Sequence, residues 1–179
     1  MNRNSFDPKI SNNFFQLIMN NKETTQFVIR TVLAKDDIAV KTVNTTSASV
    51  DVTAEDDSEI QYDIVMYQLS EHTLSSKREP NVLNQAILIN NNKPMLIYDI
   101  VFMDRDYYKK GLPIYTVSWR INETSEVVVN SPHTVYVNMD YTDESSDIGK
   151  LIHDLGCTDP QDMYHEVLRQ SAKHILGDI

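Results

Sequence analysis

The chain has 179 residues, of which 41% are hydrophobic and 23% are charged, and this balance predicts one compact domain over residues 1–179. Sixteen Lys and Arg against 26 Asp and Glu give a formal charge of −10, which repels a phosphate backbone unless basic residues gather on one face. No run reaches the roughly 18 apolar residues of a membrane span, and the polar start lacks a secretory pattern, so we expect a cytoplasmic protein.

The first 34 residues predict two helices. An apolar stripe at helical spacing is formed by Ile10, Phe14, Leu17 and Ile18, and the pair Asn20-Asn21 breaks it. A second helix is expected from Lys22 to about Ala34, because its apolar and β-branched residues share one face: Thr24, Phe27, Val28, Thr31 and Val32. Both helices are expected to cover a core.

From Ile38 the hydrophobic period changes to two, which is typical of strands. A strand around residues 50–54, a turn at 55–58 and a strand at 61–68 predict a hairpin. Its core face would hold Val50, Val52, Ala54, Ile60, Tyr62, Ile64 and Met66. Its opposite face would hold Asp51, Asp63, Val65 and Tyr67, within reach of one another across an antiparallel pair.

The remainder of the chain predicts further scaffold. A helix is expected to start near Pro80 and continue through residues 82–89, followed by a buried strand at 95–103. The apolar residues at 127–129 and 135–137 predict two strands around a turn. Residues 158–160 read as the start of a final helix, whose expected core side consists of Tyr164, Val167, Leu168, Ser171 and Ile175.

Several of these segments together resemble one family. They are residues 49–56 and 62–67 of the hairpin, residues 98–103, Lys110-Gly111-Leu112-Pro113-Ile114-Tyr115, residues 134–138, and residues 148–154 with 157–164. The chain resembles the PD-(D/E)xK nuclease family transposases, relatives of the recombination-promoting nucleases, over most of its length. The resemblance implies an α/β restriction-endonuclease-like core, with a central mixed β-sheet flanked by helices and a helical C-terminus.

The resemblance also implies a metal site on the hairpin. In the family an Asp on one strand and a Glu on its partner bind a divalent metal, and a Lys or Gln two residues after that Glu positions the attacking water. Asp51 matches the first acid. The second acid falls at Val65 and the Gln falls at Tyr67, so two of the three roles are vacated. Asp51 is then a relic, and no metal is expected.

Two features bear on whether activity survives. Asp63 lies on the same strand face as Val65, roughly 6.6 Å away by the strand rise, so a displaced Asp51/Asp63 pair is an alternative metal site. After the hairpin, Lys77 and Arg78 remain as weak phosphate-binding candidates, but Pro80 interrupts the basic helix that relatives carry.

Other catalytic chemistry finds little support. Cys157 is the only cysteine, which excludes an internal disulfide and a Cys-pair metal site, and the five His show no metal-binding motif. We therefore expect a catalytically inactive nuclease homologue of mobile-element origin, without a cofactor, that binds a protein partner and binds nucleic acid weakly or not at all. The alternatives are a Mg²⁺-dependent DNA endonuclease using Asp51 and Asp63, and an acidic inhibitor of a nucleic-acid-binding host defence protein. The oligomeric state is left open.

Overall fold

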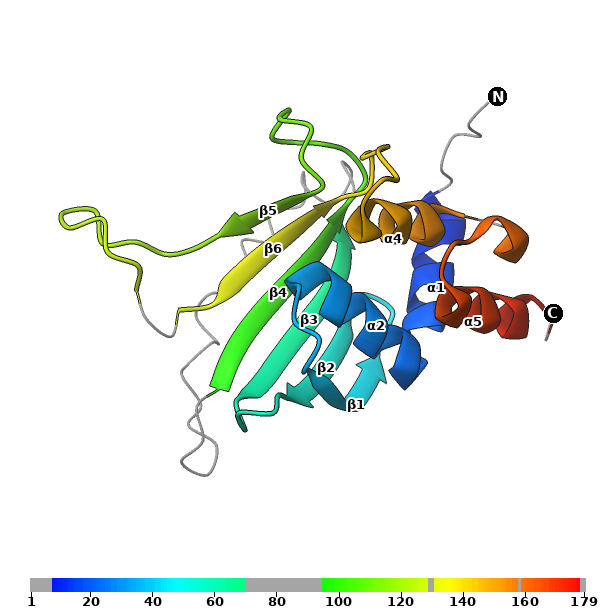
Figure 1. The fold of residues 1–179 in the computed structure, drawn as a ribbon, viewed down its shortest axis with the longest axis horizontal. Coiled ribbons are helices and arrows are strands. Elements are labelled where there is room, and N and C mark those ends of the chain that lie inside the picture. Colours follow the sequence, from blue (N-terminus) through cyan, green and yellow to red (C-terminus); the bar gives the residue numbers. More distant parts are fainter. Residues whose placement is uncertain (1–7, 70–94, 129–130, 158, 178–179) are drawn as a thin grey trace.

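A computed structural model describes residues 8–69, 95–128, 131–157 and 159–177 (Figure 1). Its helices are α1 (Pro8–Met19), α2 (Lys22–Leu33), α4 (Asp147–Gly156) and α5 (Glu166–Gly177), with a 3₁₀ turn at Pro160–Asp162. Its strands are β1 (Ala39–Thr45), β2 (Val50–Glu55), β3 (Gln61–Leu69), β4 (Met95–Met103), β5 (Ile114–Val117) and β6 (His133–Asn138).

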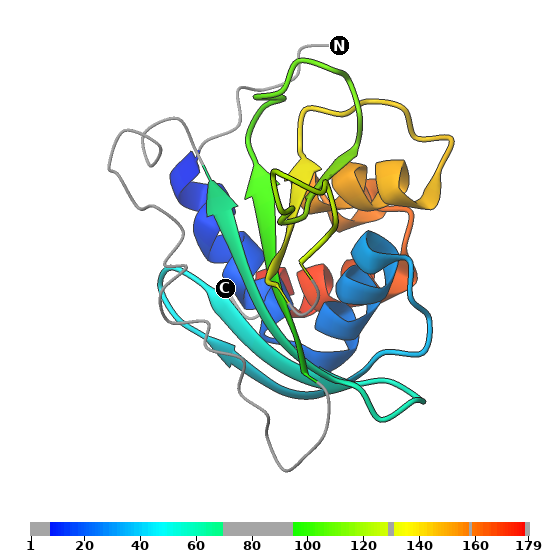
Figure 2. The ribbon, with the colours of Figure 1, turned by 90° about the vertical axis from the view of Figure 1, so that its left-hand side faces the viewer.

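The strands form one six-stranded mixed sheet in the order β1-β2-β3-β4-β6-β5. Strands β1, β2 and β3 are antiparallel neighbours, β4 runs parallel to both β3 and β6, and β5 closes the far edge antiparallel to β6. The described helices pack against one another and against one face of the sheet (Figures 1 and 2). The predicted α/β class, with a mixed sheet flanked by helices and a C-terminal helix, is thereby confirmed.

The core lies between this sheet and the helices. On the strands it uses the alternating set predicted for the hairpin, since Val50, Val52, Ala54, Tyr62, Ile64 and Met66 are all buried. Strands β4 and β6 continue the same face with Ile100, Phe102, Val135 and Val137. The helices contribute Phe15, Ile18, Val28, Ile29, Val32, Leu151, Ile152 and Leu168.

Local chemistry sets the helix ends. Asn21 is the N-cap of α2, and its Oδ1 accepts hydrogen bonds from the backbone N–H groups of Glu23 (2.9 Å) and Thr24 (3.2 Å). Ser146 caps α4 in the same way. Gly149 follows in the first turn of α4, where a Cβ would lie 1.9 Å from the carbonyl oxygen of Asp143, so only glycine fits there.

Some sequence predictions need correction. Leu17 is 53% exposed, and Phe15 and Met19 are buried instead, because the core face of α1 is rotated from the predicted stripe. The final helix starts at Glu166, since Asp159 and Pro160 form only a 3₁₀ turn, which leaves Tyr164 exposed ahead of the helix.

The segment at 127–128 does not join the sheet. Val127 forms one isolated bridge with Arg120 in a projecting hairpin, and residue 129 lies outside the described residues. The helix predicted near Pro80, with Lys77 and Arg78, also lies outside them. Within the described ranges, no helix combines the length and the apolar character needed to cross a membrane.

Candidate functional site

The hairpin of β2 and β3 places the predicted site residues on the sheet face opposite the core. Asp51 pairs directly with Val65, and Thr53 pairs with Asp63, which precedes Val65 by two residues on β3. All of these positions alternate with buried core residues of the same strands, so Asp51, Asp63, Val65 and Tyr67 share one face. The predicted grouping of these four residues is confirmed by the register.

The two carboxylates of the hairpin influence each other. Burial, and then the negative charge of Asp51, raise the pKa of Asp63 above its ordinary value. Asp51 itself accepts a hydrogen bond from Ser49 Oγ at 3.2 Å. Within the described part of the chain, no three His, Cys, Asp or Glu side chains are grouped so that they would hold a metal ion. Asp51 and Asp63 are therefore near neighbours for which the described residues supply no third ligand.

Asp99 is a site residue that the sequence prediction missed. It lies on β4 in register with Val65, so Asp51, Val65 and Asp99 form one row across β2, β3 and β4. The predicted buried strand is confirmed for residues 100–103, whereas residues 95–99 are only half-buried. One signal was available, because Asp99 is the single charge in the apolar run 95–103.

A second row, which contains three tyrosines and Val101, lies next to the first. Tyr67 pairs with Val101, Val101 with Tyr136, and Tyr136 with Tyr115, across β3, β4, β6 and β5. The Tyr108 ring packs 4.7 Å from the Tyr115 ring and 5.7 Å from the Tyr136 ring, measured between centroids. Tyr67 is thus part of a row that contains three tyrosines.

The tyrosine row has a chemical consequence for position 67. Burial, followed by the charge of Asp99 and the proximity of Tyr136, raises the pKa of Tyr67 to about 12. The phenol therefore keeps its proton at neutral pH and offers neither a general base nor an anionic metal ligand.

Cys157 and His153 are of residue types that form a nucleophile and a base in some enzymes, and their side chains lie close together. Cys157 Sγ lies 3.5 Å from His153 Nδ1. Burial, and then the negative charges of Asp154 and other nearby acids, raise the pKa of Cys157 to about 11. Because the thiolate is the nucleophilic form of cysteine, this thiol is inert at neutral pH.

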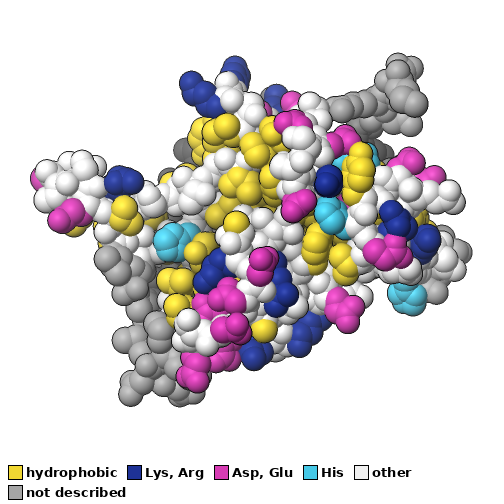
Figure 3. Space-filling model, in the orientation of Figure 1, with side chains coloured by type: hydrophobic (Ala, Val, Ile, Leu, Met, Phe, Trp, Pro, Cys, Tyr) yellow, Lys and Arg dark blue, Asp and Glu magenta, His cyan; other side chains and the backbone are white. Residues whose placement is uncertain are grey.

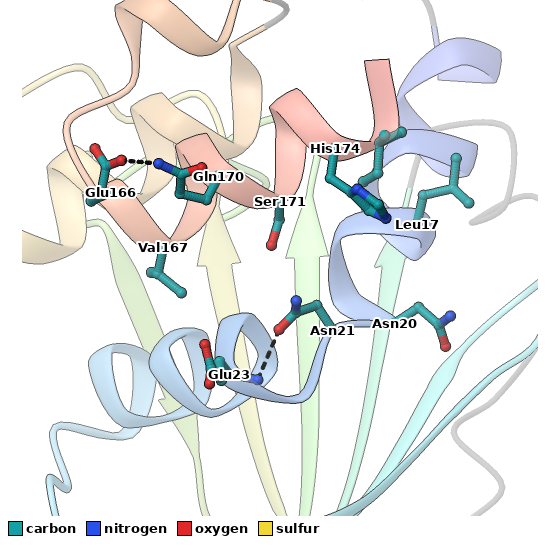
Figure 4. Close-up of a pocket in the computed structure, with 10 residues that line it drawn as sticks. Leu17, Asn20, Asn21, Glu23, Glu166, Val167, Gln170, Ser171 and His174 are labelled. Carbon is teal, nitrogen blue, oxygen red and sulfur yellow. Dashed lines mark hydrogen bonds between the residues drawn. The ribbon is translucent and has the colours of Figure 1, made fainter. Parts of the chain in front are cut away.

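A groove of about 470 Å³ lies on the helical side, between α5 and the junction of α1 with α2 (Figure 4). Its polar groups hold hydrogen bonds within the protein: Asn21 caps α2, Glu166 accepts from Gln170, and Ser171 Oγ lies 2.6 Å from Thr24 Oγ1. The groove is separated by the core from the face that carries Asp51. The contact between Ser171 and Thr24 joins α5 to α2, and the groove adds nothing to the chemistry of the sheet face.

A buried polar cluster stabilises the turn between β2 and β3. Asp56 is 6% exposed and its Oδ2 accepts hydrogen bonds from Tyr62 Oη (2.7 Å) and Lys35 Nζ (3.0 Å). Burial disfavours the charge of Asp56, but the hydrogen bonds from Tyr62 and Lys35 outweigh it and lower its pKa to about 2. The hydrogen bonds of Lys35 with Tyr62 and with Asp56 raise the pKa of the Lys35 ammonium group.

The Asp56 cluster predicts a loss of stability in acid. Because the pKa of Asp56 is depressed from 3.8 to about 2, its contribution is complete above about pH 5 and is lost as pH falls towards 2. The difference between these two pKa values corresponds to about 2.5 kcal/mol. We expect Asp56→Asn to lower the free energy of unfolding in urea at pH 7 by about that amount and to flatten its decline between pH 5 and 3. Asp57→Asn, at the exposed neighbouring residue, is the control, and an equal loss in both variants would contradict the assignment.

Comparison of the chain with protein-family models, with curated proteins and with solved structures found no match in any of the three.

Proposed function

We propose that the protein is a nuclease-like domain without a working metal site, which acts by binding a protein partner. The observation that carries this proposal is the register of β2 and β3, in which Val65 lies directly opposite Asp51. Mg²⁺ and Mn²⁺ take oxygen ligands, and an isopropyl group at this position supplies none. One retained carboxylate without its cross-strand partner rarely displaces the water shell of Mg²⁺.

The restriction-endonuclease-like fold is part of the proposal. The mixed sheet with its helical layer supports it at the level of architecture. The net charge of −10 supports a protein rather than a nucleic acid as the partner, because phosphate contacts require gathered positive charge. Nucleic-acid binding is proposed to be weak and strongly dependent on salt.

A second candidate function is a metal-dependent DNA endonuclease that uses Asp51 and Asp63. The proximity of the two carboxylates favours it, since the charge of Asp51 raises the pKa of Asp63. Among the described residues, however, no third carboxylate, His or Cys is grouped with these two so that a metal ion would be held. The geometry therefore supports the binding function better.

A cleavage assay separates the two functions. We expect the wild-type protein to leave supercoiled plasmid and single-stranded DNA intact in 10 mM Mg²⁺ or Mn²⁺, at about the rate of buffer alone, because the metal that activates water is not held. Asp51→Ala and Asp63→Asn, purified in parallel, control for contaminating nuclease. Cleavage by the wild type that both substitutions abolish would establish the endonuclease and refute the binding-only proposal.

A further inference from the structure

The segment from β5 to residue 128 concentrates exposed hydrophobic side chains. Residues 118–128 form a hairpin arm that projects from the body beyond β5 (Figure 1), held by the Arg120–Val127 bridge and by backbone bonds between Trp119 and Val128 and between Ile121 and Glu126. Half of the exposed large hydrophobic residues of the described chain are on β5 and this arm, each 40–47% exposed: Val117, Trp119, Ile121, Val127 and Val128. Figure 3 shows hydrophobic atoms at the arm's surface.

The two edges of the sheet differ in how they meet solvent. Strand β1 carries a register irregularity between Val40 and Thr42, and Lys41 on this edge is paired with Glu55 at 3.5 Å. Bulges and edge lysines are devices that prevent pairing with another chain. Strand β5 has the sequence Ile-Tyr-Thr-Val, without charge, bulge or internal proline. Of the two edges, β5 is the one suited to accept another strand.

The hydrogen-bond pattern shows which groups of β5 face outward. The N–H of Asn138 donates to the carbonyl of Pro113 at 2.9 Å, and the register pairs Tyr115 with Tyr136. Because bonded and non-bonded pairs alternate in an antiparallel ladder, Tyr115 directs its backbone bonds to β6. The backbone N–H and C=O groups of Ile114 and Thr116 therefore point to the free edge.

The distribution of formal charge along the chain indicates which partner can bind at this edge of the sheet. Residues 107–128 contain three basic residues, Lys109, Lys110 and Arg120, and two acidic ones, Glu123 and Glu126, a formal charge of +1. The whole chain carries −10. Two copies of the chain repel one another over most of their surfaces, but not where these segments meet. A second copy can therefore approach this stretch without the net repulsion that acts between the rest of the two chains.

We propose that two copies of the chain pair through β5 and the hairpin arm, in a symmetric antiparallel contact centred on Tyr115. Ile114 of one copy then exchanges both backbone bonds with Thr116 of the other, and the arms cover one another's hydrophobic residues. The five exposed side chains offer roughly 400 Å² per copy, or about 800 Å² for the pair, against about 1,200–2,000 Å² in stable interfaces. The dimer is accordingly of micromolar affinity, and it does not depend on the function proposed above.

Sedimentation equilibrium tests this proposal. The wild type is expected to shift from 20.6 kDa to twice that mass with a dissociation constant of about 1–100 µM. Thr116→Pro removes an outward N–H without removing a bond to β6, and proline is tolerated at such edge positions. It is expected to weaken the dimer at least 10-fold. Thr116→Ala, which keeps the N–H, is the matched control and is expected to stay within about threefold of the wild type.

Trp119→Ser provides an independent variant, since this side chain lies on the arm and is 47% exposed. It is expected to weaken the dimer at least 10-fold, because aromatic residues dominate such contacts. Raising the salt from 50 to 500 mM is expected to tighten the dimer by screening the repulsion between two chains of charge −10. A wild type that remains monomeric at 200 µM, or a dimer unaffected by either Thr116→Pro or Trp119→Ser, would overturn the proposal.

Discussion

Replacement of Asp154 by alanine is expected to lower the free energy of unfolding by about 3–5 kcal/mol, among the largest losses for any single acid of this chain. The Asp154 side chain has no exposed surface. Its Oδ1 accepts from the backbone N–H of Tyr164, and its Oδ2 accepts from the backbone N–H and from Nδ1 of His165, each at 2.8 Å. Alanine would leave these partly buried donors without their acceptor, which costs up to about 1–3 kcal/mol each.

The loss should appear in chemical denaturation at pH 7. Asp154 joins α4 to the segment that leads into α5, so the variant is also expected to exchange the amide hydrogens of α5 faster than those of the sheet. Asp162→Ala, at an exposed acid in the same connection, is the matched control and should cost less than about 0.5 kcal/mol. Equal stability of Asp154→Ala and the control would show that the buried carboxylate is not an anchor.

The hairpin could be predicted because its signal is local. A period of two over residues 50–54 and 61–68 assigns each side chain to a face without knowledge of the rest of the fold, and Asp51, Asp63, Val65 and Tyr67 were found on the predicted face. The boundaries of α2 were equally accessible, because Asn21 is a strong N-cap residue. Within α1, by contrast, Leu17 and Phe15 are both apolar, and only packing selects which of them is buried.

The rest of the site depends on contacts between residues far apart in sequence. Asp99 enters the Asp51 row only through the parallel pairing of β3 with β4, and the tyrosine row requires the order β3-β4-β6-β5. Neither follows from periodicity within one strand. The anchor at Asp154 is formed with backbone groups at residues 164 and 165, in a connection where the sequence pattern predicted a continuous helix. Because almost every residue has a backbone N–H group, the sequence does not indicate which of these groups a buried carboxylate will bind.

The double substitution Val65→Glu and Tyr67→Gln, which introduces the residues that the proposed nuclease resemblance implies, is expected to create a metal site. A carboxylate at position 65 would lie between Asp51 and Asp99 in the register of the sheet. Without metal, three neighbouring acids repel, so the double variant should be less stable than the wild type in EDTA. With a dissociation constant of about 10 µM, 1 mM Mn²⁺ should return about 2.7 kcal/mol of stability. The same addition should leave the wild type unchanged.

The control for this experiment is Val65→Gln with Tyr67→Gln, which introduces similar volume and polarity without the carboxylate. Since hard divalent cations favour charged oxygen ligands, this variant should bind Mn²⁺ at least 10-fold more weakly than the Glu variant. Cleavage of DNA is not required to return with the metal, because positioning of the phosphate supplies a large part of the rate.

Calorimetric titration of Mn²⁺ into the wild type and into Val65→Glu/Tyr67→Gln, side by side, tests most directly whether Val65 is what removes the metal site. We expect no binding tighter than about 1 mM for the wild type and a one-site isotherm in the range of about 10–100 µM for the double variant, lost again when Asp51→Ala is added. A micromolar isotherm for the wild type that disappears in Asp51→Ala would contradict the proposed absence of a metal site, as would a folded double variant that binds no metal.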